Sequence, residues 1–171
     1  MIRWNRHLLL FGLLALAVTG CATDEGLSPV KSGKAPVITQ LTANDDVFEG
    51  NPVFSPDGQW ILFESDAAGN MDIWMISADG GETFQITSHP GFDSTPFWSP
   101  DGRRFTFESD RGGTKNIYVF DLDDPGAGPV PVTTGDWDDG SPCWSRDGAW
   151  IVYESNRDKQ GGSDLWMSPA G

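Results

Sequence analysis

The sequence predicts an all-β fold made of propeller blades, and three observations support this prediction. One turn motif occurs three times, as Ser55-Pro56-Asp57-Gly58, Ser99-Pro100-Asp101-Gly102 and Ser145-Arg146-Asp147-Gly148. Successive copies begin 44 and 46 residues apart, which is close to the length of a four-stranded propeller blade. After each copy, apolar residues recur at every second position, as they do in β-strands.

The same order of strands is expected in each copy. A short strand ends at the turn motif, where aspartate accepts hydrogen bonds from nearby backbone and glycine supplies a positive φ. The second strand follows at once, and its apolar face is made by Ile61 and Phe63, by Phe105 and Phe107, and by Ile151 and Tyr153. Third strands are expected to begin at Asp72, Asn116 and Asp164, and fourth strands over 84–87 and 130–133.

These elements give three four-stranded antiparallel repeats, with blades over about 50–87, 94–133 and 140–171, the last without its own fourth strand. The segment 37–42 resembles a fourth strand and precedes the first blade, so we expect it to close the last one. Three blades fall below the four to eight that are typical of a closed propeller. Two explanations remain: the blades belong to a longer protein with a ring of six or more, or two chains pair about a two-fold axis as a homodimer. The sequence stops inside a turn motif, at Gly171, which favours the longer protein.

The first 20 residues are typical of a secretory signal peptide. Arg3 and Arg6 precede an apolar run over 8–18, which is too short to span a bilayer of about 30 Å. The residues Val18-Thr19-Gly20-Cys21 resemble the lipobox of bacterial lipoproteins, which implies that Cys21 is acylated. Residues 21–36 are rich in Ser, Gly, Lys and Pro, so a flexible tether is expected there. We therefore expect a periplasm-facing protein with a lipid anchor, in the outer membrane because Ala22 follows the cysteine.

The composition is strongly acidic, with 25 acidic and 11 basic residues and a formal net charge of −14. Such a surface repels nucleic acid and attracts basic partners. No catalytic group, metal or cofactor is expected, because the chain has two histidines, no Gly-x-Ser-x-Gly motif and no His/Cys cluster. Cys143 occupies the position of Val53 and Phe97 in the other copies, so a buried, inert thiol is expected.

The repeat resembles a known family in the residues over 96–111 and in Asp72-Ile73-Trp74, which follow the pattern P-x-W-S-P-D-G-x-x-I-x-F-x-S-D-R with a later D-I-W. This pattern is similar to the TolB-type propeller repeat, and the similarity extends over nearly all of the chain from Val37 onward. It implies a periplasmic, non-catalytic scaffold that binds a protein or peptide. The same repeat also builds the propellers of serine oligopeptidases, so the alternative is the propeller portion of a longer enzyme, oligopeptidase-like or sugar-processing.

Candidate ligand residues lie at the ends of the blades opposite the turn motifs. An acidic residue stands three positions before the proline of each first strand, namely Glu49, Asp93 and Asp139, and the last of these follows Asp136, Trp137 and Asp138. One interpretation is an acidic channel mouth that attracts a basic peptide or a cation. The other is that these acids cap hydrogen bonds at the strand starts. Glu64, Glu108 and Glu154 recur at the ends of second strands, where pairing with Arg111 or Arg157 would make them structural.

Overall fold

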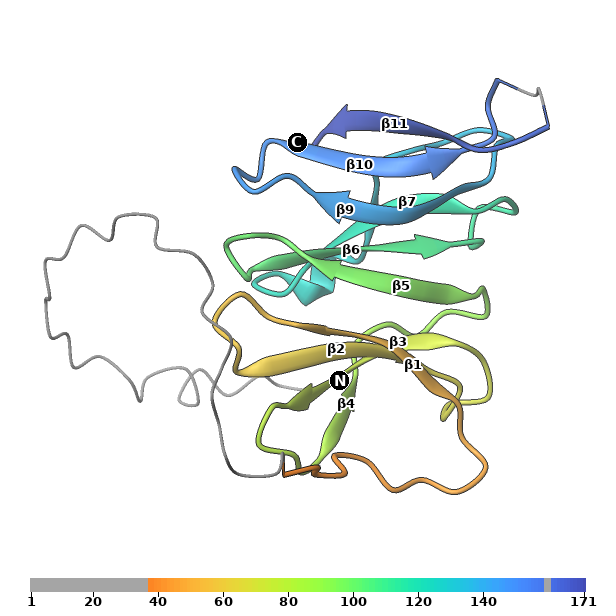
Figure 1. Ribbon diagram of the computed structural model, residues 1–171. Coiled ribbons are helices and arrows are strands. Elements are labelled where there is room, and N and C mark those ends of the chain that lie inside the picture. The colour runs from red at the N-terminus through yellow and green to blue at the C-terminus, as the bar shows by residue number, and fades with distance from the viewer. Residues whose placement is uncertain (1–36, 159–160) are drawn as a thin grey trace, which may run out of the picture. The chain divides into compact units, whose positions relative to one another are not determined.

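The computed structural model describes residues 37–158 and 161–171, and it confirms the all-β class. From Thr39 onward the residues form one compact unit of three antiparallel sheets, which we call blades 1 to 3 (Figure 1). Blade 1 contains β1 (Glu49–Phe54), β2 (Trp60–Ser65), β3 (Asp72–Ser77) and β4 (Thr83–Gln85). Blade 2 contains β5 (Asp93–Trp98), β6 (Arg104–Ser109), β7 (Asn116–Asp121) and β8 (Val130–Pro131), with the short 3-10 helix η1 (Pro125–Ala127) before β8. Blade 3 contains β9 (Asp139–Trp144), β10 (Trp150–Ser155) and β11 (Asp164–Pro169).

The predicted strand over 37–42 is not formed in this structure. These residues are irregular, and Val37 and Ile38 are 83% and 92% exposed. Eleven strands are therefore seen among the described residues, against the twelve expected, and blade 3 has three strands in the order β11-β10-β9. The signal peptide, Cys21 and the tether were predicted over residues that lie outside the described ranges. Within those ranges, no helix is both long and apolar enough to cross a membrane.

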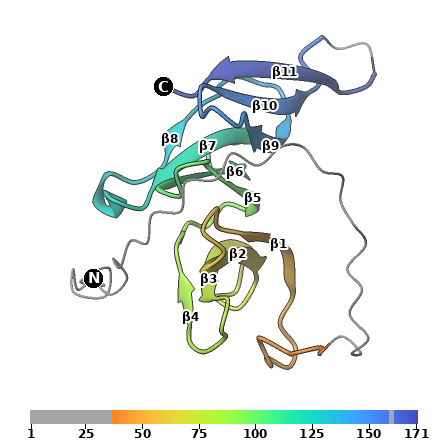
Figure 2. The same cartoon turned by 60° about the vertical axis from the view of Figure 1, so that its left-hand side comes forward.

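The three blades lie one above another and fan out from their first strands (Figures 1 and 2). First strands of neighbouring blades contact each other, β1 with β5 and β5 with β9. The last strands, β4 and β8, lie at the outer edges (Figure 2). This geometry follows from the sequence, because sheets with two apolar faces must stack on one another to bury both.

Apolar side chains fill the spaces between the blades. Leu62, Ile73 and Met75 of blade 1 pack against a wall of aromatic rings from blade 2, made by Trp98, Phe105, Phe107, Tyr118 and Phe120. Between blades 2 and 3 the buried cluster is Ile117, Trp144, Ile151 and Tyr153. The alternation at period two in the second strands thus places Phe105 and Phe107 toward blade 1 and Ile151 and Tyr153 toward blade 2, whereas Leu62 faces the blade that follows it.

The turn motif has the same hydrogen bonds in each copy. In blade 2 the Ser99 hydroxyl donates to Asp101 at 2.5 Å and accepts from the Arg104 backbone N–H at 3.0 Å, while the Arg103 N–H donates to Asp101 at 3.1 Å. Gly102 has a φ of 69°, which only glycine adopts without strain. These bonds lower the pKa of Asp101, the Ser99 hydroxyl contributing most. The turns lie at one end of the blades, which we call the turn end.

We expect the substitution Asp101→Asn to lower the free energy of unfolding at pH 7 by no more than about 1 kcal/mol, because the turn is largely solvated. A carboxylate with a lowered pKa in the folded state stabilises above its unfolded pKa, and this contribution is lost as the pH falls through the folded pKa. Urea unfolding of the two proteins from pH 7 to pH 2.5 measures the difference, which should shrink on acidification. A difference that stays constant with pH would contradict this account.

Candidate functional site

The predicted ligand acids of blades 2 and 3 form buried ion pairs. Asp93 begins β5 and is fully buried, and Nη2 of Arg111 donates to its two carboxylate oxygens at 2.9 and 2.7 Å. Asp139 begins β9 and is equally buried, with Nη2 of Arg157 at 3.0 and 2.9 Å. Each arginine also donates through Nε to a serine hydroxyl at the end of the second strand.

Aromatic rings complete the setting of each arginine. The Arg111 guanidinium lies 5.1 Å from the ring centroid of Phe107 and 5.0 Å from that of Tyr118. Arg157 lies in the same way over Tyr153 and Trp166, at 5.2 and 4.9 Å. Cation–π attraction to the rings and the ion pair with the buried carboxylate therefore both fix the position of each guanidinium group.

The expectation that Asp93 and Asp139 line an open acidic mouth is wrong, because their oxygens are occupied by arginine and inaccessible. In the sequence each of these acids precedes its arginine by 18 residues, a recurrence that could have identified the pairs. Glu49 differs, because the residue 18 positions later is Ala67. Its carboxylate instead accepts from the Thr42 hydroxyl and, at 3.0 Å, from the Asn44 amide.

Glu64 and Glu108 connect neighbouring blades, a role that the sequence did not reveal. Glu64 accepts from the backbone N–H of Thr95 in blade 2 at 3.0 Å, and Glu108 accepts from that of Ser141 in blade 3 at 3.3 Å. Both donors lie in β-bulges and have positive φ values of 49° and 52°. The expected pairing of Glu108 with Arg111 is not seen; its cation is Lys115, at 3.1 Å.

Buried Asp72 lies near the ion pair of Asp93. Its carboxylate accepts from the Gln85 amide at 3.1 Å and from the His89 N–H at 3.4 Å. Burial raises its pKa, and the negative charge of Asp93 adds to the effect. This group therefore destabilises the fold above its unfolded pKa, and the penalty is relieved as the pH falls.

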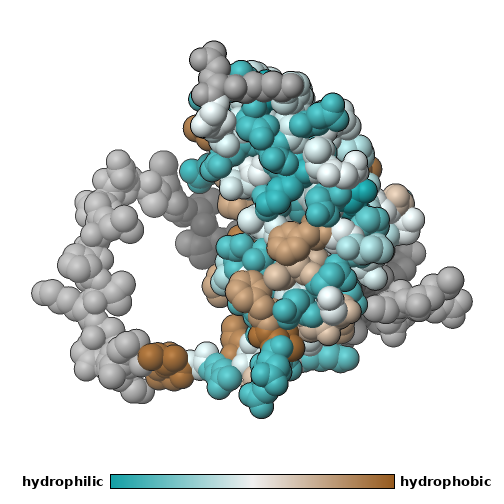
Figure 3. All heavy atoms as spheres, turned by 90° about the vertical axis from the view of Figure 1, so that its right-hand side faces the viewer, coloured by the Kyte–Doolittle hydropathy of each residue, from teal (hydrophilic) through white to brown (hydrophobic). Residues whose placement is uncertain are grey.

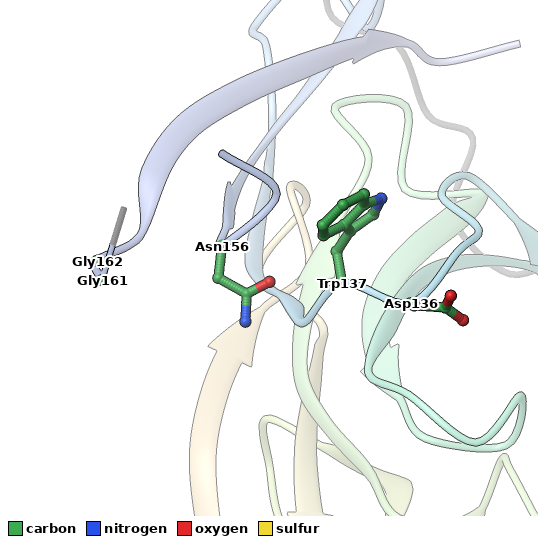
Figure 4. Close-up of a pocket in the computed structure, with 5 residues that line it drawn as sticks. All are labelled: Asp136, Trp137, Asn156, Gly161 and Gly162. Atoms are coloured by element: carbon green, nitrogen blue, oxygen red, sulfur yellow. The ribbon is translucent and has the colours of Figure 1, made fainter. Parts of the chain in front are cut away.

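A pocket of about 450 Å³ opens at the end of the blades away from the turn motifs, which we call the loop end. It is lined by Asp136, Trp137, Asn156, Gly161 and Gly162 (Figure 4). The indole of Trp137 stands between Asn156 and Asp136, and the Asp136 carboxylate points away from the ring (Figure 4). Two of the predicted ligand residues, Asp136 and Trp137, thus belong to one hollow.

Asp138, the remaining predicted acid of this loop, is fixed beside the pocket. Its backbone N–H donates to Oδ1 of Asn156 at 3.0 Å, and Nδ2 of Asn156 donates back to its carboxylate at 3.4 Å. Asn156, Gly161 and Gly162 were not predicted as site residues, although they lie in the loop over 156–163, which is two residues longer than its counterparts in blades 1 and 2. Hydrophilic residues cover most of the loop end over blade 3, as Figure 3 shows from that side.

The pocket offers one aromatic side chain, one amide and the exposed carboxylate of Asp136, and the exposed carboxylate of Asp138 lies beside it. These groups suit a cationic or amphipathic side chain that stacks on the indole while carboxylates attract its charge. Among the described residues, no three His, Cys, Asp or Glu side chains lie close enough together to hold a metal ion. Cys143 is exposed, which corrects the expectation of a buried thiol, because no further blade covers that face of blade 3 in this structure.

We expect Arg111→Met to lower the free energy of unfolding by about 3–5 kcal/mol, because it leaves the buried Asp93 carboxylate without a cation. The double variant Asp93→Asn, Arg111→Met should recover part of this loss. Urea unfolding of both variants and the parent protein measures the effect. A loss below about 1 kcal/mol for the single variant would show that the pair is not a structural element.

Solved structures with the same fold include TolB proteins. A TolB-like protein from Agrobacterium tumefaciens is 28% identical, with a TM-score of 0.62 over 70% of this chain and 42% of that protein. TolB from Acinetobacter baumannii is also 28% identical, with a TM-score of 0.63 over 71% of this chain and 30% of that protein. An oligogalacturonate lyase from Vibrio parahaemolyticus shares the fold at 23% identity and a TM-score of 0.55, over 68% of this chain and 32% of the lyase.

Among curated proteins, an uncharacterized protein of Agrobacterium fabrum is 43% identical over 51 residues, which are 30% of this chain and 17% of that protein. The chain thus spans less than half the length of these relatives. A family model described as the TolB beta propeller domain matches residues 30–162, well over half of the sequence. This match agrees with the repeated turn motif and with the four-stranded blades. The chain therefore belongs to the TolB beta-propeller domain family.

Proposed function

We propose that this chain is a non-catalytic scaffold that binds a protein or peptide at the loop end of its blades. The observation that supports this proposal is the pocket beside Trp137, where an aromatic side chain and exposed carboxylates lie next to the loop over 156–163, which is two residues longer than its counterparts in blades 1 and 2. Repeat proteins commonly use such loops for binding, because the blades below hold the loops in place while tolerating changes in them.

The partner that best fits this pocket is a basic segment of a protein or peptide. The chain carries a formal net charge of −14, so its field attracts cations from a distance. An arginine side chain would stack on the Trp137 indole with its charge near Asp136 and Asp138. Asp93 and Asp139 do not contribute to this attraction, because each forms an ion pair with a buried or half-buried arginine.

The location proposed for this scaffold is the cell envelope, on the periplasmic side. Support comes from the apolar run over 8–18, from Cys21 in its lipobox-like context and from membership of the TolB propeller family. In this proposal the lipid on Cys21 anchors the chain to the outer membrane, and residues 21–36 let the blades reach away from the surface.

A second candidate function is the propeller portion of a longer enzyme. It is favoured by the short span of the chain relative to its structural neighbours, which include prolyl endopeptidases at 22% identity with 21% of their length covered. The DNA beyond the codon for Gly171 tests this candidate. A catalytic domain in frame would support it, and a stop codon would remove it.

Binding of an arginine-containing peptide tests the scaffold proposal. We expect a peptide with three arginines in a Gly/Ser background to bind the blades at low salt, and a neutral Gly/Ser peptide of the same length not to bind. Trp137→Ala and Asp136→Asn should each weaken binding by roughly tenfold, which corresponds to loss of a cation–π contact or a partly screened charge. Isothermal titration calorimetry at two salt concentrations measures these affinities.

The matched control is Asp79→Asn, which removes one exposed carboxylate at the turn end. It makes the same change in net charge, so its affinity should stay within about twofold of the parent protein if attraction is local. Equal weakening by Asp79→Asn and Asp136→Asn would mean that only the overall charge acts, and the pocket would then not be the binding site.

A further inference from the structure

We propose that two copies of this chain bind each other by exchanging the segment 39–42, which adds a fourth strand to β11 of the other copy. This inference goes beyond the proposed function and does not depend on the Trp137 pocket. Strand β11 is the edge of a three-stranded sheet, whereas its counterparts β3 and β7 each carry a further strand, β4 or β8.

The open side of blade 3 is apolar and exposed where the other blades are buried. Leu165 is 77% exposed, whereas its counterpart Ile73 is fully buried. Met167 is 61% exposed, against 5% for Met75. In blade 1 these positions are covered by blade 2, so the same side of blade 3 has the chemistry of an inter-blade surface.

The segment 39–42 repeats the residues that make β4 fit its neighbour. Gln40-Leu41-Thr42 matches Gln85-Ile86-Thr87 at the end of blade 1. In blade 1 the Gln85 amide donates to Asp72 at 3.1 Å, and the Thr87 hydroxyl accepts from the Ile73 backbone N–H at 2.9 Å.

Blade 3 carries the corresponding partners, since Asp164 and Leu165 stand where Asp72 and Ile73 stand in blade 1. Gln40 would therefore bond Asp164, and the Thr42 hydroxyl would accept from the Leu165 N–H. The register of β3 with β4 pairs Met75 with Phe84, which transfers to Met167 opposite Thr39.

The donor comes from a second copy because the segment cannot reach β11 of its own chain. Thr42 bonds Glu49 at the start of β1, and blade 2 lies between blade 1 and blade 3 (Figure 1). Closing three blades on themselves would need a sharper turn per blade than the four to eight blades of known propellers. Two copies related by a two-fold axis contribute six blades and make the exchange twice.

The exchange also places blade 1 of one copy against blade 3 of the other. In the described chain each fourth strand, β4 or β8, leads directly into the blade that packs on its own, and the segment 39–42 leads in the same way into blade 1. Glu154 would then accept from the backbone N–H of Asn51, as Glu64 does from Thr95. The side chain of Glu154 is exposed and its carboxylate accepts no hydrogen bond from another described residue, and Asn51 has a φ of 46°, close to the 49° of Thr95. Phe54 of blade 1 is 62% exposed, against 5% for its counterpart Trp98.

Three other apolar residues on this side of blade 1 are already buried. Ile61, Phe63 and Ile76 form a cluster of their own with Trp74. Docking would therefore remove little further surface of these three residues from water. The gain in apolar burial would therefore come mainly from Leu165, Met167 and Phe54.

Disulfide trapping in the full chain tests the strand exchange. Two copies with different tags are expressed together in a Cys143→Val background, one with Thr39→Cys and the other with Met167→Cys. Directly opposed residues in antiparallel strands lie within the range that a disulfide spans. We expect a cross-linked species that carries both tags and disappears on reduction.

The matched control moves one cysteine by one residue, as Gln40→Cys with Met167→Cys. Neighbouring residues of a strand point to opposite faces, so this pair should cross-link roughly tenfold less. Equal yields from the two pairs, or no species with both tags, would overturn the proposal. Each single-cysteine chain with an unaltered partner measures the background from Cys21.

Copurification of the two tagged copies tests the apolar contact separately. Met167→Asp should abolish copurification, whereas Val130→Asp should leave it unchanged. Met167 and Val130 are both 61% exposed, so neither change should prevent folding, which thermal unfolding verifies. Retained copurification of the Met167→Asp variant would exclude this face of blade 3 as the contact.

Discussion

Burial of both faces of each sheet is the constraint on which this structure depends. A blade of three or four short strands cannot cover itself, so its stability comes from neighbours on either side. Blade 2 has both neighbours, and Phe105, Phe107 and Ile117 are fully buried. Blade 3 has one, and Leu165 remains in solvent although its counterparts are buried. Position in the array, and not sequence alone, thus decides what each residue experiences.

The parts of the fold that depend on local sequence were predictable. The Ser-x-Asp-Gly turns specify their own hydrogen bonds within five residues, so their place at one end of every blade followed from the motif. The alternation of Ile61 with Phe63 likewise indicated which face is apolar. The segment 37–42 has the composition of a strand but is irregular in this structure, because a strand also needs a partner edge, which local sequence does not supply.

Contacts between residues that lie far apart in the sequence could not be predicted. Asp93 looked like a ligand group because its position recurs, but its charge is taken up by Arg111, which lies in the loop after the next strand. Glu64 was judged structural for the wrong reason, since it bonds the backbone of the next blade across 31 positions. Of the predicted loop residues, Asp136 and Trp137 line one pocket, and their role in binding stays a prediction.

The positive φ of Thr95 and Ser141 has a consequence for the order in which the blades form. Each residue precedes a proline and adopts a backbone conformation that costs about 1 kcal/mol outside its context. The compensating acceptor, Glu64 or Glu108, belongs to the blade synthesised earlier. Each completed blade therefore prepares the entry of the next, so the array is suited to grow from its N-terminal side as the chain emerges.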